Sequence, residues 1–118
     1  MRYEIELYET DQGSCPVSDF LGGLPPKLRR KTTTYLEVLE EGGPDLREPY
    51  TKPLGKGIFE LRCQWGSESV RLLFFYCGSR VIVVTNGFLK KTRKTPLREI
   101  RLAEMRRGDY LRRYGYEA

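Results

Sequence analysis

The chain has 118 residues, with 21 Lys and Arg against 16 Asp and Glu, so its formal net charge is +5, and it contains no histidine. Hydrophobic residues make up 39% of the chain and aromatic residues 12%, which is enough for the core of one domain and excludes a wholly disordered protein. The lack of histidine excludes His-based triads, His metal sites and imidazole acid–base catalysis.

The first half of the chain is predicted to form one strand and two helices. Residues 2–8 alternate apolar and polar side chains, which is typical of a half-buried strand. A short helix should end at Leu21, before two glycines, with Ser14 or Ser18 as its N-cap. A longer helix should begin at Pro25 and end before Gly42-Gly43-Pro44. Its predicted apolar face consists of Leu28, Thr32, Tyr35, Leu36 and Leu39.

The second half is predicted to form three strands and a final helix. Residues 45–50 should form a loop and 54–57 a turn, followed by strands over 58–65, 69–77 and 80–88. Two-residue turns at Gly66-Ser67 and Gly78-Ser79 would join these strands into an antiparallel meander. A helix over 97–113 should start at Pro96, with Thr95 as its N-cap. Its thin apolar stripe would contain Leu97, Ile100, Ala103, Leu111 and Tyr114. The order of elements predicts one α+β domain over residues 1–118, with helices packed against an antiparallel sheet.

The predicted register brings two arginines together. A two-residue turn at Gly66-Ser67 places Arg62 directly opposite Arg71, and a four-residue turn would keep both on one face, whereas an odd turn would separate them. Two like charges in this position are unfavourable unless an anion or a carboxylate such as Glu60 lies between them. The same counting places Asn86 opposite Arg71, with Phe88 and Lys90 following on that face.

The other face of the meander is predicted to be core: Phe59, Leu61, Cys63, Trp65, Val70, Leu72, Phe74, Val81 and Val83. The arginine face would then end in a cationic concavity edged by Lys52, Lys56, Lys90, Lys91 and Lys94. Residues 88–113 hold ten Lys and Arg against three acids, so nearly all of the basic excess is C-terminal. This distribution indicates a partner that carries phosphate, or an acidic protein. The plainer alternatives are surface ion pairs of the arginines with Glu60 and Glu68, ordinary packing of Phe88, and a solvated loop over 89–95.

Three cysteines, Cys15, Cys63 and Cys77, lie far apart without a C-x-x-C pair, so we expect them to be reduced, with no zinc ribbon or disulfide framework. The N-terminal alternation is unlike a signal peptide. The longest apolar runs, 72–77 and 81–84, are far shorter than the ~20 residues of a membrane span. We therefore expect a cytoplasmic protein without membrane, metal or cofactor.

Several segments occur here in a characteristic order: Lys52-Pro53-Leu54, Phe59-Glu60-Leu61-Arg62, Val70-Arg71-Leu72-Leu73-Phe74, Phe88-Leu89-Lys90-Lys91-Thr92, Lys94-Thr95-Pro96 and a basic helix containing Ala103. Together they resemble the RelE/HigB group of type II toxins, particularly its phage-derived branch, over nearly the whole chain. The resemblance implies a RelE-like fold and a small ribonuclease that enters the ribosomal A site and cuts messenger RNA. It also implies an antitoxin partner with a helix-turn-helix DNA-binding fold, and we expect the free toxin to be a monomer.

The resemblance also implies which residues act. The family's basic residues on the sheet and the following loop bind and cleave RNA, and they match Lys52, Lys56, Arg62, Arg71, Lys90 and Lys91. We further expect RNA contacts from Asn86, Arg93 and Lys94, and base stacking on Phe88. Some HigB relatives have histidines at the site, and this chain has none, so the acid and the base stay open.

Without histidine or metal, the RNA 2′-hydroxyl can still attack its neighbouring phosphate if fixed guanidinium groups meet the growing charge. Arg62 and Arg71 are the candidates for this role. The candidates for the base are Lys52, Lys56 and Glu60, and those for the acid are Lys90 and Lys91.

Two other functions fit the same sequence. Toxins of the ParE type share this fold and inhibit DNA gyrase, and a non-catalytic module could simply bind nucleic acid through the basic C-terminal segment. The clustering of basic residues on the sheet and its exit loop favours RNA.

Overall fold

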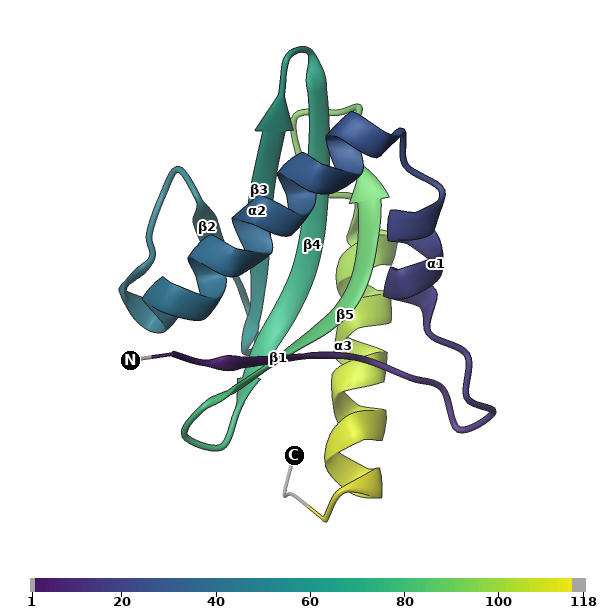
Figure 1. Cartoon of the computed structure of the whole chain (residues 1–118). Coiled ribbons are helices and arrows are strands. Elements are labelled where there is room, and N and C mark those ends of the chain that lie inside the picture. Colours follow the sequence, from purple (N-terminus) through teal and green to yellow (C-terminus); the bar gives the residue numbers. More distant parts are fainter. Residues whose placement is uncertain (1, 116–118) are drawn as a thin grey trace.

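The computed structural model describes residues 2–115, in which three helices cover the two faces of a five-stranded sheet (Figure 1). The strands lie in the order β1-β5-β4-β3-β2. Helices α1 and α2 lie on one face and α3 on the other. The elements are β1 (Glu4–Leu7), α1 (Pro16–Gly22), α2 (Pro26–Gly42), a 3₁₀ turn (Gly43–Asp45), β2 (Thr51–Gly55), β3 (Ile58–Trp65), β4 (Glu68–Cys77), β5 (Val81–Leu89) and α3 (Leu97–Arg113). The predicted α+β class is confirmed. Within residues 2–115, none of the helices is long and apolar enough to cross a membrane.

The sheet is mixed, so the prediction of a purely antiparallel sheet is wrong. Strand β1 pairs in parallel with β5, from Glu4 opposite Val81 to Leu7 opposite Val84. Alternation within residues 2–8 predicts a strand but carries no information about a partner that lies far away in the sequence.

An additional strand, β2, forms after the expected loop over 45–50 and includes the first two residues of the turn expected over 54–57. It pairs with β3 at the edge of the sheet, with Lys52 opposite Glu60 and Pro53 opposite Phe59. Proline cannot donate a backbone hydrogen bond, and an edge strand is the place in a sheet that tolerates this. The proline therefore masked a real strand in the sequence pattern.

The β3–β4 hairpin confirms the prediction, with Arg62 directly opposite Arg71. The predicted β4–β5 register is wrong, because Phe88 lies opposite Arg71 and Asn86 lies opposite Leu73. The connection at 78–80 has three residues, and a bulge follows at Thr85, between the Leu73–Asn86 and Phe74–Val84 pairs. The odd turn reverses the alternation of β5 and the bulge restores it.

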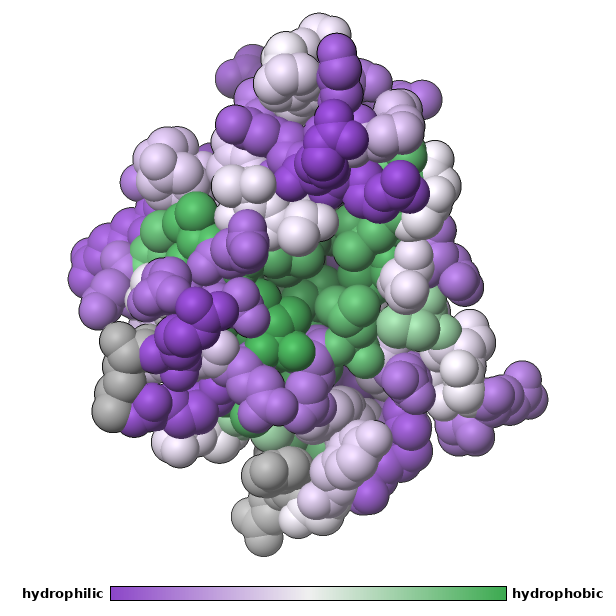
Figure 2. Space-filling model, in the orientation of Figure 1, coloured by the Kyte–Doolittle hydropathy of each residue, from purple (hydrophilic) through white to green (hydrophobic). Residues whose placement is uncertain are grey.

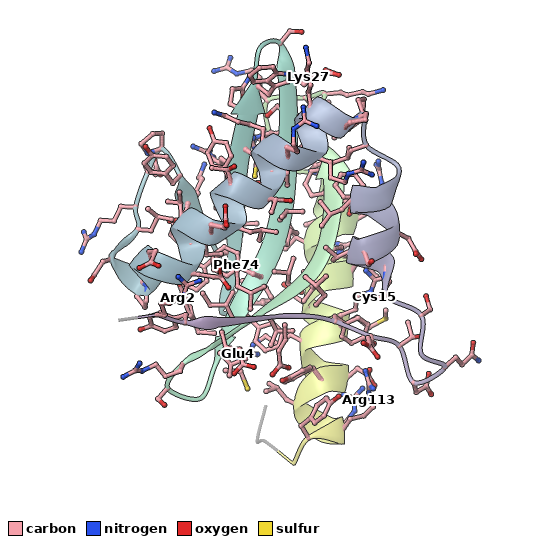
Figure 3. All side chains as sticks on the ribbon, viewed as in Figure 1. Arg2, Glu4, Cys15, Lys27, Phe74 and Arg113 are labelled. Carbon is pink, nitrogen blue, oxygen red and sulfur yellow. The ribbon has the colours of Figure 1, made fainter. Side chains whose placement is uncertain are left out.

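Each face of the sheet carries its own core. Under α1 and α2 lie Val17, Leu28, Leu39, Leu61, Leu72 and Phe74, and Figure 3 shows Phe74 between α2 and the sheet. Under α3 lie Ile58, Leu73, Phe75, Val83, Ala103 and Tyr110. Val81 and Val83 pack on the α3 side, opposite to the prediction, because they precede the bulge. Trp65, which was expected in the core, is 45% exposed.

The helix ends differ from the expected capping. The N-cap positions are Cys15, Pro25 and Pro96, and none makes a side-chain cap hydrogen bond, so the caps predicted at Ser14, Ser18 and Thr95 are wrong. Helix α2 ends before Gly43, whose φ is 50°. A side chain at this position would place its Cβ atom 2.3 Å from the Tyr3 ring, so the position requires glycine. Helix α3 occupies the predicted span, although Leu97 and Tyr114 of its expected stripe are exposed.

Candidate functional site

A buried carboxylate lies at the centre of the site. Glu60 is on β3, and its side chain has no exposed surface. A buried charge is costly unless other groups pair with it. Its Oε1 atom lies 3.3 Å from Arg62 Nε and 3.6 Å from Arg71 Nε, and its Oε2 atom accepts a hydrogen bond from the Thr95 hydroxyl. Both oxygens are therefore occupied by groups from β3, β4 and the loop before α3.

The two arginines form a guanidinium pair, Arg62 and Arg71, on neighbouring strands. The Arg62 side chain is 25% exposed and that of Arg71 is 11% exposed. Arg71 Nη1 donates hydrogen bonds to Ser69 Oγ at 2.5 Å and to the Val70 carbonyl at 3.3 Å. Within the described residues, the buried Nε atom of Arg71 has no hydrogen-bond partner. These contacts fix the pair in position, and its partly exposed guanidinium groups can contact a ligand.

Lys90 and Lys52 complete a basic cluster with the guanidinium pair around Glu60. Burial lowers the pKa of Lys90, and Arg71, Arg62 and Lys52 act in the same direction, whereas Glu60 opposes them. Burial also lowers the pKa of Arg71, with Glu60 again opposing it. Lys52 lies directly opposite Glu60 on β2. Arg62 and Arg71 form ion pairs with the one carboxylate, and Lys52 and Lys90 add two further positive charges nearby, so the cluster has an excess of positive charge.

The other predicted residues lie at different distances from this cluster. Phe88 is opposite Arg71 on the same face and packs partly against the α3-side core. The exposed cations Lys91, Arg93 and Lys94 lie in the loop from β5 to α3, which passes behind the β3–β4 hairpin in Figure 1. Lys56 lies in the β2–β3 turn with φ 54°, before the start of β3 and away from the guanidinium pair.

Asn86 has a structural environment. It is 4% exposed, and its Nδ2 atom donates to Glu99 Oε1 at 3.0 Å and to the Glu99 carbonyl at 3.3 Å. The Thr85 hydroxyl lies 2.6 Å from its Oδ1 atom. The amide thus connects the bulge of β5 to the first turn of α3, close to the loop that carries the exposed cations.

Sequence reasoning missed Thr95 as a member of the site. Its position before a proline and a helix suggested a cap, but its hydroxyl instead reaches the Glu60 carboxylate, 35 residues away in the chain. Tyr35, Tyr50 and Gln64 were also missed, and they line a pocket beside the guanidinium pair. The alternation of β3 already places Gln64 on the face of Arg62, whereas no local pattern relates Tyr50 to either arginine.

The arrangement suits an anion with several oxygens. Planar guanidinium groups bind phosphate through paired hydrogen bonds, and the partial burial of Arg71 strengthens such contacts. In the described part of the chain, no three Cys, Asp or Glu side chains gather as potential metal ligands. Figure 2 shows the opposite side of the molecule, that of α1 and α2, where hydrophilic residues surround the beginning of α2 above a hydrophobic band.

Comparison with known proteins gives one family. Residues 19–108 match the model of the family described as phage derived protein Gp49-like (DUF891). The match includes α2, the whole β2–β5 part of the sheet and most of α3, and therefore every member of the basic cluster. No curated protein matches the chain.

Proposed function

We propose, from the premise that this chain belongs to the phage-derived Gp49-like family, a family associated with RelE-type toxins, that it is the toxin of a type II toxin–antitoxin pair. Its proposed activity is ribosome-dependent cleavage of messenger RNA, which stops translation. The observation that carries this proposal is the guanidinium pair, held opposite each other across a ladder by the buried Glu60. Glu60 offsets the repulsion from the buried side, and the partly exposed guanidinium groups are suited to bind a phosphate from the outer side.

The proposed chemistry is attack of an RNA 2′-hydroxyl on the adjacent phosphorus. The new O–P bond replaces the bond to the 5′-oxygen, so the products are a 2′,3′-cyclic phosphate and a 5′-hydroxyl. Negative charge grows on the non-bridging phosphate oxygens during this step. Arg62 and Arg71 would meet that charge with donors that are already fixed by Glu60, Ser69 and their own strands.

Lys90 and Lys52 are the proposed acid and base. The lowered pKa of Lys90 makes its ammonium group a better proton donor to the leaving 5′-oxygen than an ordinary lysine. Lys52, which lies opposite Glu60 on β2, is the proposed acceptor of the proton of the attacking 2′-hydroxyl. Glu60 itself is a positioning residue, because its Oε1 atom accepts from Arg62 and forms an ion pair with Arg71, while its Oε2 atom accepts from Thr95.

The exposed loop extends the positive field beyond the cluster. Lys91, Arg93 and Lys94 would bind phosphates on either side of the cut, and Phe88 would offer an aromatic surface. An acidic antitoxin would complement the same charges and cover the cluster. The proposed partners are therefore messenger RNA on the ribosome and an antitoxin.

A reconstituted translation reaction tests this proposal. Purified protein is added to ribosomes translating a reporter transcript, and new 5′ ends are mapped by primer extension. We expect cuts within the reading frame, and a loss of about 10²–10³-fold in rate for Arg71→Ala, as for removal of a fixed oxyanion donor. The matched control is Arg80→Ala, an exposed arginine in the turn at the opposite end of β4.

Two results would overturn the proposal. An intact transcript in the presence of folded protein excludes the nuclease, and a gyrase supercoiling assay then tests the ParE-type alternative. Equal cleavage by wild type and Arg71→Ala would keep a nuclease but remove the guanidinium pair from its mechanism.

A further inference from the structure

A pocket of about 310 Å³ adjoins the guanidinium pair at the outer edge of β3. Strand β2 begins at Thr51, opposite Leu61, so it does not extend along the last residues of β3. Tyr35 from α2 and Tyr50 from the segment before β2 close around this edge. The pocket is lined by Tyr35, Pro49, Tyr50, Arg62, Gln64 and Arg71.

The two tyrosines give the pocket aromatic walls. Their ring centroids lie 6.3 Å apart with an interplanar angle of 52°, and Tyr50 is 42% exposed. The backbone holds Tyr50 in place, because its carbonyl accepts from the Arg62 N–H at 2.8 Å and its N–H donates to the Arg47 carbonyl at 2.9 Å. An exposed aromatic ring on a fixed backbone is a suitable surface for base stacking.

The pocket shares its polar wall with the site. Arg62 and Arg71 contact Glu60 on one side and line this pocket on the other. A nucleotide whose phosphate is bound by the guanidinium pair therefore has an aromatic pocket next to it for its base. The Gln64 amide adds a polar group: its Nε2 atom donates to the Gly66 carbonyl at 3.2 Å, and its carbonyl oxygen can accept from a base.

We propose that this pocket is a nucleobase subsite, in which the base of the nucleotide held by Arg62 and Arg71 stacks on Tyr50 and donates a hydrogen bond to Gln64. The inference rests on the proposed function for the choice of RNA as ligand. The subsite would also give the protein a base preference next to the cleaved bond. Bases that present an exocyclic amino group or a ring N–H can donate to Gln64, and bases that present only acceptors cannot.

A binding experiment tests the subsite without any cleavage. The probe is a 2′-deoxy trinucleotide with 2-aminopurine in the centre, which lacks the attacking hydroxyl and loses fluorescence when its base stacks. We expect quenching by the wild type and by Tyr50→Phe. Tyr50→Ala should bind about tenfold more weakly and abolish the quenching. The matched control is Tyr114→Ala, which removes an exposed tyrosine of the C-terminal segment.

The outcomes separate the subsite from the nuclease proposal. Unchanged affinity and quenching in Tyr50→Ala overturn the subsite, even if the protein cuts RNA. No quenching by the wild type also overturns it. Quenching that depends on Tyr50 supports the subsite even if transcripts stay intact, in which case the nuclease alone is rejected. Gln64→Leu removes the acceptor, so it should abolish the preference for bases that donate, and an unchanged preference in this variant would overturn the role of Gln64.

Discussion

Arg62 and Arg71 lie directly opposite each other on β3 and β4, and both form ion pairs with the same oxygen of Glu60, at 3.3 Å and 3.6 Å. The carboxylate is buried and the guanidinium groups are partly exposed. The carboxylate thus neutralises the repulsion from within the protein, and the outer side of the pair can bind an anion. Glu60 therefore contributes both to stability and to the proposed phosphate site.

Replacement of Glu60 by Gln should reduce both stability and activity. The two guanidinium groups lose their shared anion, so we expect the free energy of unfolding to fall by about 3 kcal/mol, as for a broken buried ion pair. Denaturant unfolding measures this change. In an Arg71→Met background the same replacement should cost clearly less, because one of the repelling charges is gone. Equal costs in both backgrounds would show that Glu60 does not act through Arg71.

The titration of Lys90 provides a second test. Burial lowers its pKa below 10.5 and Glu60 counteracts this shift, so Glu60→Gln should lower the pKa of Lys90 further. Reductive ¹³C-methylation followed by NMR titration reports each lysine separately. The exposed Glu68→Gln, on β4, is the matched control and should leave the Lys90 curve unchanged. A Lys90 curve that moves to higher pH in Glu60→Gln would contradict the arrangement of charges described above.

Thr95 should hold the loop over 90–96 against the sheet. Thr95→Val keeps the shape of the side chain but removes the hydrogen bond to Glu60, so we expect a loss of about 1 kcal/mol in stability. Amide hydrogen exchange in the loop should accelerate at the same time. Thr92→Val is the matched control, because the Thr92 hydroxyl donates only locally, to the Lys94 carbonyl at 2.8 Å. Identical exchange in the two variants would show that the Thr95 contact does not order the loop.

Stability should fall at alkaline pH because of buried tyrosines. Burial raises the pKa of Tyr76 to about 12, and burial with the hydrogen bond to Glu6 raises the pKa of Tyr110. Above about pH 10 these tyrosines lose their protons in the unfolded chain, whereas Tyr76 and Tyr110 keep theirs in the folded protein. The free energy of unfolding therefore falls as pH rises, by about 1.4 kcal/mol per pH unit for each such tyrosine. Below about pH 9 this contribution is constant.

Tyr110→Phe isolates one of these groups. The variant loses the hydrogen bond to Glu6, so its stability at pH 7 should be somewhat lower than that of the wild type. Its loss of stability between pH 10 and 11 should nevertheless be smaller by about 1 kcal/mol, because one titrating group is gone. Denaturant unfolding at pH 7, 10 and 11 measures both effects. Parallel pH curves for the two proteins would rule out Tyr110 as a source of the alkaline loss.

The guanidinium pair was predictable because its position depends on one short turn. Gly66-Ser67 is a local signal, and a two-residue turn fixes which residues of β3 and β4 lie opposite each other. The face of the sheet on which Phe88 lies was also predicted correctly, although the prediction assumed a two-residue turn and no bulge. The three-residue turn at 78–80 and the bulge at Thr85 each shift the alternation by one, so their effects cancel beyond the bulge. Val81 and Val83 precede the bulge and were therefore assigned to the wrong face.

The rest of the site depends on contacts that no local pattern contains. Thr95 reaches Glu60 only because the loop before α3 folds back over the end of the sheet. Tyr50 reaches Arg62 because the edge strand that begins at Thr51 pairs with β3, and the sequence pattern did not predict this strand. The parallel pairing of β1 with β5 is of the same kind, since the partners are separated by most of the chain.

The most direct test of the central claim is transcript integrity in bacteria after induced expression, with 5′ ends mapped across the transcriptome. The wild type should arrest growth and produce new cuts within reading frames. The Arg62→Ala, Arg71→Ala double variant, expressed at the same level and folded, should produce neither. Growth arrest with intact transcripts, or cuts that persist in the double variant, would contradict the account of a guanidinium pair that cleaves messenger RNA.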